Sequence, residues 1–229
     1  MNFRIGGIQK SSLLDYPDKI SAIVFTQGCN FRCGYCHNPE LIAISTPKVS
    51  TEECFAFLQT RIGKLDGVVI TGGEPCIQSG LKDFIKKIKS LGFLVKLDTN
   101  GAYPEILREL LDETLLDYIA IDIKAPLDKY TEITKNIANT EKIKESIRLI
   151  MNSDAEYEFR TTIIKSQLSF EDFEKIGKLI HGAKKYYLQK FEPSKIVDKT
   201  LINEKTYSTE DFDRIIQILQ ASIKWVEVR

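Results

Sequence analysis

Three cysteines lie close together near the start of the sequence. Cys29, Cys33 and Cys36 form a CxxxCxxC arrangement. Thiolates are soft ligands that select zinc or iron–sulfur clusters. Structural zinc sites usually have four ligands in two pairs, whereas this sequence has no second CxxC and only two histidines, His37 and His181. Three thiolates on a four-iron cluster would leave one iron without a protein ligand, and such an open position is where a substrate or cofactor binds.

Two other interpretations of the three cysteines stay open at this point: a structural zinc site, and buried thiols that bind no metal. The flanking glycines and polar residues are typical of a loop rather than of a core, which favours a metal centre. The two remaining cysteines, Cys54 and Cys76, lie far away in the sequence. Cys54 falls in an amphipathic segment, and we expect both thiols to pack in the core.

Composition and charge exclude several classes of protein. The chain has 229 residues, of which 43% are hydrophobic and 28% charged, as expected for a folded domain. Its 32 basic and 32 acidic residues give a formal net charge of 0, whereas nucleic acids and anionic membranes demand a basic excess. Five cysteines are an odd number for a secreted disulfide scaffold, and neither a signal peptide nor a stretch of about 20 apolar residues is visible. We expect one cytoplasmic domain over residues 1–229.

An alternation of short and long segments must position these residues. Runs rich in β-branched residues predict strands, and longer segments of helical period predict helices between them. The predicted strands cover residues 21–26, 67–71, 94–98, 118–123, 156–164, 185–189 and 225–228, and the predicted helices cover 51–62, 81–91, 103–111, 141–151, 170–180 and 209–223. About six βα units imply a parallel sheet with helices outside it. Because a closed barrel needs about eight units, we predict an α/β fold with a partial (β/α)6 TIM-type barrel rather than an open doubly wound sheet.

Polar residues follow the predicted strands at their carboxyl ends, where parallel α/β sheets place their chemistry. The strand-end segments are Gln27-Gly28-Cys29, Gly72-Gly73-Glu74-Pro75, Asp98-Thr99-Asn100-Gly101, Asp122 with Lys124, and Gln189-Lys190-Phe191, and Arg160 lies on the predicted strand over 156–164. If the strands are parallel, all of these segments converge on one mouth.

The cysteine motif, with Tyr35 directly before its third cysteine, resembles the signature of the radical S-adenosylmethionine (SAM) enzymes. This resemblance implies that Cys29, Cys33 and Cys36 hold a 4Fe-4S cluster, whose open iron binds the amino and carboxylate groups of SAM. It also implies that one electron cleaves SAM to methionine and a 5′-deoxyadenosyl radical, which abstracts a hydrogen atom.

Longer stretches are similar to the glycyl-radical-enzyme activases, strongly from about Ile8 to Asp128 and more loosely to the end of the chain. These stretches are the segment from Phe25 to Glu40, Gly72-Gly73-Glu74-Pro75, Asp98-Thr99-Asn100-Gly101 and Asp122-Ile123-Lys124. The opening Leu13-Leu14-Asp15-Tyr16-Pro17-Asp18-Lys19 is most similar to the anaerobic ribonucleoside-triphosphate reductase activating proteins. The formate-lyase activases tend to show Asp-Gly-Pro-Gly at this point.

The resemblance implies contacts with the amino group and the adenine of SAM. Gly72, Gly73 and Glu74 would bind the methionine ammonium, since glycines admit a close backbone approach and a carboxylate suits a cation. Tyr35 would lie near the adenine, unless it only packs beneath the loop.

Further contacts are implied at the later strand ends. Lys124 would pair with the SAM carboxylate, and Asp98, Thr99 and Asp122 resemble residues that bind a monovalent cation beside that carboxylate in the formate-lyase activase. The alternative is that Asp98 caps a turn and that Asp122 and Lys124 form an ordinary ion pair. Arg160 lies within a predicted strand, where it would meet SAM or the substrate backbone if it faces inward.

Three more residues have two interpretations each. Gln189 and Phe191 are candidate adenine contacts, and packing at the end of a strand explains them equally well. His37 follows the last predicted cluster ligand, where it would hydrogen-bond near the cluster or SAM, or have a structural role.

These expectations combine into one predicted enzyme: a radical SAM activase that generates a glycyl radical on a partner, an anaerobic ribonucleoside-triphosphate reductase. Only Cys54 lies between the cysteine motif and Gly-Gly-Glu, so we expect no inserted ferredoxin-like domain, and an external flavodoxin or ferredoxin as electron donor. One alternative is a radical SAM enzyme acting on a pyruvate formate-lyase-like target, a peptide or a small molecule. Another is an iron–sulfur electron-transfer protein, which explains the cysteines but not Gly-Gly-Glu.

Overall fold

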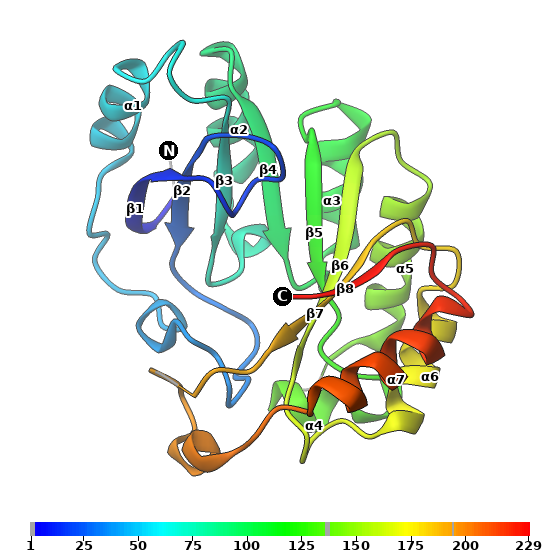
Figure 1. Cartoon of the computed structure of the whole chain (residues 1–229). Helices are drawn as coiled ribbons and strands as arrows, with labels where there is room; N and C mark the ends of the chain where they lie inside the picture. The colour runs from blue at the N-terminus through cyan, green and yellow to red at the C-terminus, as the bar shows by residue number, and fades with distance from the viewer. Residues whose placement is uncertain (1–2, 136–137, 194) are drawn as a thin grey trace.

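The computed structural model describes residues 3–135, 138–193 and 195–229. Its centre is an eight-stranded sheet in which the strands lie in chain order (Figure 1). The strands are β1 (Ile5–Ser12), β2 (Ser21–Thr26), β3 (Gly67–Gly72), β4 (Leu94–Thr99), β5 (Tyr118–Asp122), β6 (Glu156–Ile163), β7 (Tyr186–Lys190) and β8 (Val226–Val228). β1 is antiparallel to β2, and each later neighbouring pair is parallel. Because β8 does not pair with β1 in the described ranges, the sheet is an incomplete barrel.

Helices connect the strands and cover the outer face of the sheet. They are α1 (Thr51–Gln59), α2 (Leu81–Ser90), α3 (Pro104–Asp112), α4 (Tyr130–Thr134), α5 (Thr140–Met151), α6 (Phe170–Leu179) and α7 (Thr209–Gln220), with short 3-10 turns η1 (Pro39–Leu41), η2 (Pro75–Ile77), η3 (Leu127–Lys129) and η4 (Lys199–Asn203). In Figure 1, α1 and α2 lie beside the earlier strands, at the left, and α5, α6 and α7 beside the later strands, at the right. A capping box of Ser50 and Glu53 fixes the start of α1.

Alternation along the strands gives the sheet two different faces. On β4, Val95 and Leu97 pack into the main core between the sheet and the helices. Leu94 instead belongs to a second, smaller core with Tyr16 and Tyr118, on the inner face of the half-barrel. The inner face is therefore apolar near the amino ends of the strands, and polar residues follow nearer their carboxyl ends.

The segment between β1 and β2 closes the amino end of the half-barrel. Tyr16 is 4% exposed, and its ring centroid lies 5.8 Å from that of Tyr118 at the start of β5. The Lys19 N–H donates to the Tyr16 carbonyl at 3.2 Å, which tightens the turn. This seal leaves the carboxyl ends of the strands as the side of the barrel that is available for chemistry.

The predicted partial barrel with outer helices is confirmed. No element was predicted over residues 5–12, where β1 pairs with β2. The helices predicted over 51–62 and 209–223 end earlier, at Gln59 and Gln220, because hydrogen bonds of the 3-10 type follow them. In the parts of the chain that the structure describes, no helix has both the length and the apolar character needed to cross a bilayer.

Candidate functional site

A cavity of about 310 Å³ opens at the carboxyl ends of the parallel strands. The arrowheads of β2, β4 and β5 all point towards this edge of the sheet (Figure 1). The cavity is lined by residues of the cysteine loop and of the strand ends: Cys29, Phe31, Cys33, Tyr35, Cys36, His37, Asn38, Ile42, Thr71, Gly72, Gly73, Glu74, Asp98, Thr99, Asn100, Asp122, Lys124, Arg160, Thr162, Gln189 and Lys190. Segments that are far apart in the sequence therefore share one cavity, as parallel strands require.

Backbone hydrogen bonds hold the cysteine loop against the mouth of the barrel. The Arg32 N–H donates to the Thr134 carbonyl at 2.8 Å, and the Cys36 N–H donates to the Cys33 carbonyl at 3.1 Å. The Arg32 guanidinium folds back and donates to the Cys29 carbonyl at 2.6 Å. The loop is thereby fixed with all three cysteines on the wall of the cavity.

The donor set of the loop fits a 4Fe-4S cluster. Burial, and then the nearby Glu74 carboxylate, raise the pKa of Cys29 to about 12, so its thiolate form requires a positive centre. Within the described ranges, no group of three or more His, Cys, Asp or Glu side chains is arranged to hold a single metal ion. The thiolates of a cubane cluster each bond a different iron. The buried Tyr35 hydroxyl, without a hydrogen-bond partner in the described part of the chain, leaves a polar group for a bound ligand.

Glu74 is held by three groups of the protein itself. Its Oε1 accepts hydrogen bonds from the Cys76 N–H at 2.9 Å and from the Thr99 hydroxyl at 2.7 Å, and its Oε2 accepts from the Asn100 N–H at 2.7 Å. Burial raises the pKa of Glu74 above its ordinary value. The carboxylate that was expected to meet the methionine ammonium therefore also joins the end of β3 to the end of β4.

The two glycines before Glu74 allow the chain to pack against itself. Gly72 has a φ of 109°, a conformation that favours glycine. A Cβ on Gly73 would lie 2.1 Å from the Gly28 carbonyl oxygen, which accepts the Glu74 N–H at 2.7 Å. The glycines were expected to admit a close backbone approach. The group that lies close to them is the Gly28 carbonyl, in the loop that precedes the cysteines.

Charged side chains form a continuous network at the floor of the cavity. The Asp98 carboxylate pairs with the Lys96 ammonium at 2.5 Å and with the Arg160 guanidinium at 3.2 Å. The same guanidinium pairs with Asp122 at 2.9 Å, and Lys124 pairs with the other Asp122 oxygen at 3.1 Å. Arg160 therefore faces inward and joins two neighbouring strand ends.

This network keeps both carboxyl groups ionised. Burial alone would raise the pKa of Asp122, but Arg160 and Lys124 outweigh it and lower the pKa from 3.8 to about 2. At Asp98, burial is likewise outweighed by Arg160 and Lys96, so its pKa is also lowered. Both acids therefore present negative charge to the cavity throughout the neutral pH range.

We expect Asp122 to contribute to stability above about pH 4 and to lose that contribution as the pH falls towards 2. A carboxyl group with a lowered folded-state pKa stabilises the fold only while it is ionised, and the shift corresponds to about 2 kcal/mol. Urea denaturation of the apoprotein at a series of pH values measures the effect. The Asp122→Asn variant should lack this acid-dependent loss, whereas Asp83→Asn, on the exposed face of α2, should keep it. Parallel profiles for wild type and Asp122→Asn would contradict the expectation.

Thr99 does not join Asp98 and Asp122, although the three were expected together. Because side chains alternate along β4, Thr99 faces the opposite side of the strand from Asp98. Its hydroxyl donates to Glu74 at 2.7 Å and accepts from the Gly101 N–H at 3.2 Å. The Thr99 hydroxyl is therefore directed at Glu74 and not at the two aspartates with which it was expected to bind a monovalent cation.

The segment after β7 supplies one of its two predicted cavity residues. Gln189 lines the cavity, whereas Phe191 is buried outside the lining, with its ring stacked on His37 at a centroid distance of 6.2 Å. His37 Nε2 also lies 3.0 Å from the Glu192 carbonyl oxygen. His37 therefore ties the cysteine loop to the chain that follows β7.

Lys96 and Asn100 take part in the site although neither had a predicted role there. The sequence could have indicated Lys96, because a residue two positions before Asp98 in the same strand faces the same side of the sheet as Asp98. For Asn100 the sequence indicated only a turn. Its side chain donates a hydrogen bond to the Asn30 side chain at 2.7 Å and so links the end of β4 to the cysteine loop. Cys54, by contrast, is buried in the main core.

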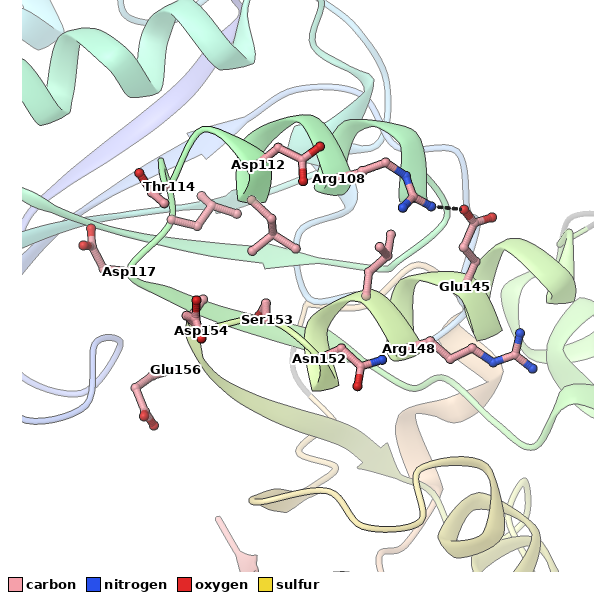
Figure 2. Close-up of a pocket in the computed structure, with 14 residues that line it drawn as sticks. Arg108, Asp112, Thr114, Asp117, Glu145, Arg148, Asn152, Ser153, Asp154 and Glu156 are labelled. Atoms are coloured by element: carbon pink, nitrogen blue, oxygen red, sulfur yellow. Dashed lines mark hydrogen bonds and ion pairs between the residues drawn. The ribbon is translucent and has the colours of Figure 1, made fainter.

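A larger groove of about 720 Å³ lies between α3 and α5, beside the amino ends of β5 and β6 (Figure 2). Arg108 and Glu145 pair across one end of it at 2.6 Å. Its lining mixes acidic, basic and apolar residues and includes none of the cysteines. We therefore place the chemistry in the smaller cavity, where thiols and charged strand ends meet.

Comparisons with known proteins show the family of the chain. The model of the radical SAM superfamily matches residues 23–180. Two proteins of Methanocaldococcus jannaschii, both named "Putative glycyl-radical enzyme activating enzyme", are 37% identical over 204 residues, covering 87% of this chain and 84% of the relative, and 33% identical over 181 residues, covering 76% and 68%. A radical SAM methyltransferase from Sphaerobacter thermophilus shares the fold, with a TM-score of 0.74 and 20% identity over 93% of this chain and 67% of its own.

The fold, the cysteine loop and these matches together define the class: the chain belongs to the radical SAM superfamily. Members of this superfamily use a 4Fe-4S cluster and SAM. Within the superfamily, the chain is a relative of proteins named as glycyl-radical enzyme activating enzymes.

Proposed function

We propose that the protein cleaves SAM reductively and generates a glycyl radical on a partner enzyme, an anaerobic ribonucleoside-triphosphate reductase. The observation that carries this proposal is the shared cavity of the three cysteines and the charged strand ends, in a chain 37% identical to a protein named as a glycyl-radical enzyme activating enzyme. The motif from Leu13 to Lys19 supports the reductase as the partner, because it resembles the activating proteins of that enzyme.

The residues of the cavity have distinct roles in this proposal. Cys29, Cys33 and Cys36 hold the cluster, which supplies one electron for the cleavage of SAM to methionine and the radical that takes a hydrogen atom from a glycine α-carbon. Lys124 binds the SAM carboxylate, and Tyr35 lies beside the adenine. The walls of the cavity hold the reacting groups together and keep water away from them.

Further contacts complete the proposed SAM site. Glu74 and the backbone of Gly72 and Gly73 receive the methionine ammonium, and Gln189 contacts the adenine. Asp122 and Arg160 orient Lys124 and the ligand. We do not include a monovalent cation, since the oxygens predicted to bind it already have partners in the protein. An external flavodoxin or ferredoxin supplies the electron.

An anaerobic incubation with the candidate reductase, SAM and a reductant tests the proposal. Electron paramagnetic resonance should detect a glycyl radical doublet on the reductase, and none when Cys36→Ala protein replaces the wild type. Cleavage of SAM without a doublet would show a radical SAM enzyme with another substrate. No SAM binding by calorimetry to the reconstituted protein would indicate an electron carrier and overturn the proposal.

A further inference from the structure

Lys96 is a charged residue buried inside the half-barrel, directly below the cavity. It is 1% exposed, and it shares the inner face of β4 with Asp98. Its ammonium lies 2.5 Å from the Asp98 carboxylate and 5.8 Å from the centroid of the Tyr118 ring. The aliphatic part of the side chain can remain in the apolar interior while its charged end reaches the floor of the cavity. A buried ammonium requires a charged partner, and Asp98 provides it.

The four carboxylate oxygens at this floor each have a cationic partner. Asp98 Oδ1 accepts from Lys96 and Asp98 Oδ2 from Arg160, whereas Asp122 Oδ1 accepts from Arg160 and Asp122 Oδ2 from Lys124. A hard metal ion needs several oxygen lone pairs directed at it. Here each of these oxygens already accepts one N–H group, and the positive charges of Lys96, Arg160 and Lys124 repel a further cation. The residues present therefore do not fit a bound monovalent ion beside Asp98.

We propose that Lys96 is the resident cation of this site, taking the place beside Asp98 that the resemblance to the formate-lyase activase gives to a monovalent metal ion. Lys96 is a positioning residue: it holds Asp98, and through Asp98 it holds the Arg160 guanidinium at the floor of the cavity. Because its ammonium is tethered to β4, the site is complete without Na⁺ or K⁺. The importance of Lys96 for SAM rests on the proposed function, whereas the independence from metal ions does not.

The pairing of individual charges in the interior explains why a cation is needed beside Asp98. The carboxylates facing this space are Asp98, Asp122 and Glu158, and the cationic groups are Lys96, Lys124, Arg160 and Arg229. Arg229 lies 3.7 Å from Glu158, and Lys124 pairs with Asp122. Without Lys96, Asp98 would have only the guanidinium of Arg160, which it shares with Asp122. Removal of Lys96 leaves three cationic groups for these three carboxylates, but it takes away the ammonium that Asp98 Oδ1 contacts and so leaves that oxygen open to an ion from solution.

The wild-type protein gives the first test. Its thermal midpoint without cluster, and the affinity of the reconstituted protein for SAM by calorimetry, should be the same within about twofold in Kd in sodium, potassium or choline chloride of equal concentration. A wild-type protein whose SAM affinity or thermal midpoint depends on Na⁺ or K⁺ would overturn the proposal. A complete absence of SAM binding would contradict the proposed function instead, and the thermal midpoints would still test Lys96.

The Lys96→Ala variant gives the second test. It should acquire a dependence on a small monovalent ion: its affinity for SAM should be about tenfold weaker in choline chloride than in the preferred alkali salt, and its thermal midpoint should rise with that alkali ion. Titration with the alkali chloride, followed by ²³Na nuclear magnetic resonance for sodium, should detect a site absent from the wild type. The double variant Lys96→Ala/Asp98→Asn should lose the dependence again, because the carboxylate that recruits the ion is gone.

A matched control separates this effect from the loss of any partly buried lysine. Lys89 pairs with Asp117 at 2.8 Å outside the cavity, so Lys89→Ala should be destabilised equally in all three salts. If Lys96→Ala does not fold in any salt, Lys96→Met keeps the volume of the side chain and is measured in the same way. A Lys96 variant that folds but shows no preference for Na⁺ or K⁺ over choline would overturn the proposal.

Discussion

A Cys33→Ala protein will carry no normal 4Fe-4S cluster and will not cleave SAM. Cys33 is 6% exposed and lines the cavity between the other two ligand positions of the loop. Without its thiolate, two irons of a cubane would lack a protein ligand. We expect the rate of reductive SAM cleavage to fall by more than about a hundredfold. Loss of a residue that only supports a metal ligand already lowers activity by about 10- to 100-fold, so loss of a ligand itself should cost more.

Visible absorption and iron content after anaerobic reconstitution, followed by chromatographic detection of 5′-deoxyadenosine, measure both losses. Cys54→Ala is the matched control, because Cys54 is a completely buried cysteine in α1 that does not line the cavity. That variant should lose about 1 kcal/mol of stability and keep its cluster. Sustained SAM cleavage by Cys33→Ala would contradict the assignment of the cysteine loop.

Gly73→Ala should lower the free energy of unfolding by about 3 kcal/mol, the upper end of the usual range for overpacking. The added Cβ would lie 2.1 Å from the Gly28 carbonyl oxygen and 3.0 Å from the Leu41 carbonyl oxygen. Both are backbone atoms, so relief requires a shift of the chain that leads into the cysteine loop. We therefore expect a reduced yield of reconstituted cluster together with the loss of stability.

Chemical denaturation of the apoprotein and iron content after reconstitution test this expectation. Gly7→Ala serves as the comparison, because no heavy atom lies within 4 Å of a Cβ built on Gly7. Its free energy of unfolding should change by only about 0.5 kcal/mol. Equal stability of the two alanine variants would contradict the expectation, because it would show that the backbone at Gly28 moves away from the added Cβ at little cost in free energy.

The interior strands could be predicted because burial on both faces makes them recognisable. β5 (Tyr118–Asp122) is a run of apolar residues that ends in an acid, and only one residue separates its observed end from the prediction. β1 (Ile5–Ser12) could not be predicted, because it contains Gly6 and Gly7 and ends in polar residues. Its strand conformation depends on pairing with β2, where the register shifts twice.

The site shows a similar division between local pattern and distant contact. The convergence of Asp98 and Asp122 followed from their places at the carboxyl ends of neighbouring parallel strands, and Arg160 joins them from the next strand, β6. The hydrogen-bond partners of Glu74 could not be predicted in this way. Asn100 lies 26 positions away, and the local turn of the chain sets the direction of its N–H. Phe191 shows the limit of the same reasoning, since this residue just beyond the end of β7 is buried against His37 and is not among the residues that line the cavity.

The chain order of the strands has a consequence for the growing polypeptide. Each strand pairs with the one synthesised just before it, so the sheet can assemble from β1 onwards while the ribosome is still translating. The cysteine loop follows β2 directly and therefore emerges early, whereas Gln189 and Lys190, which also line the cavity, emerge late. The three thiols thus stay accessible to iron and sulfide donors, and to oxidants, until most of the chain has been made.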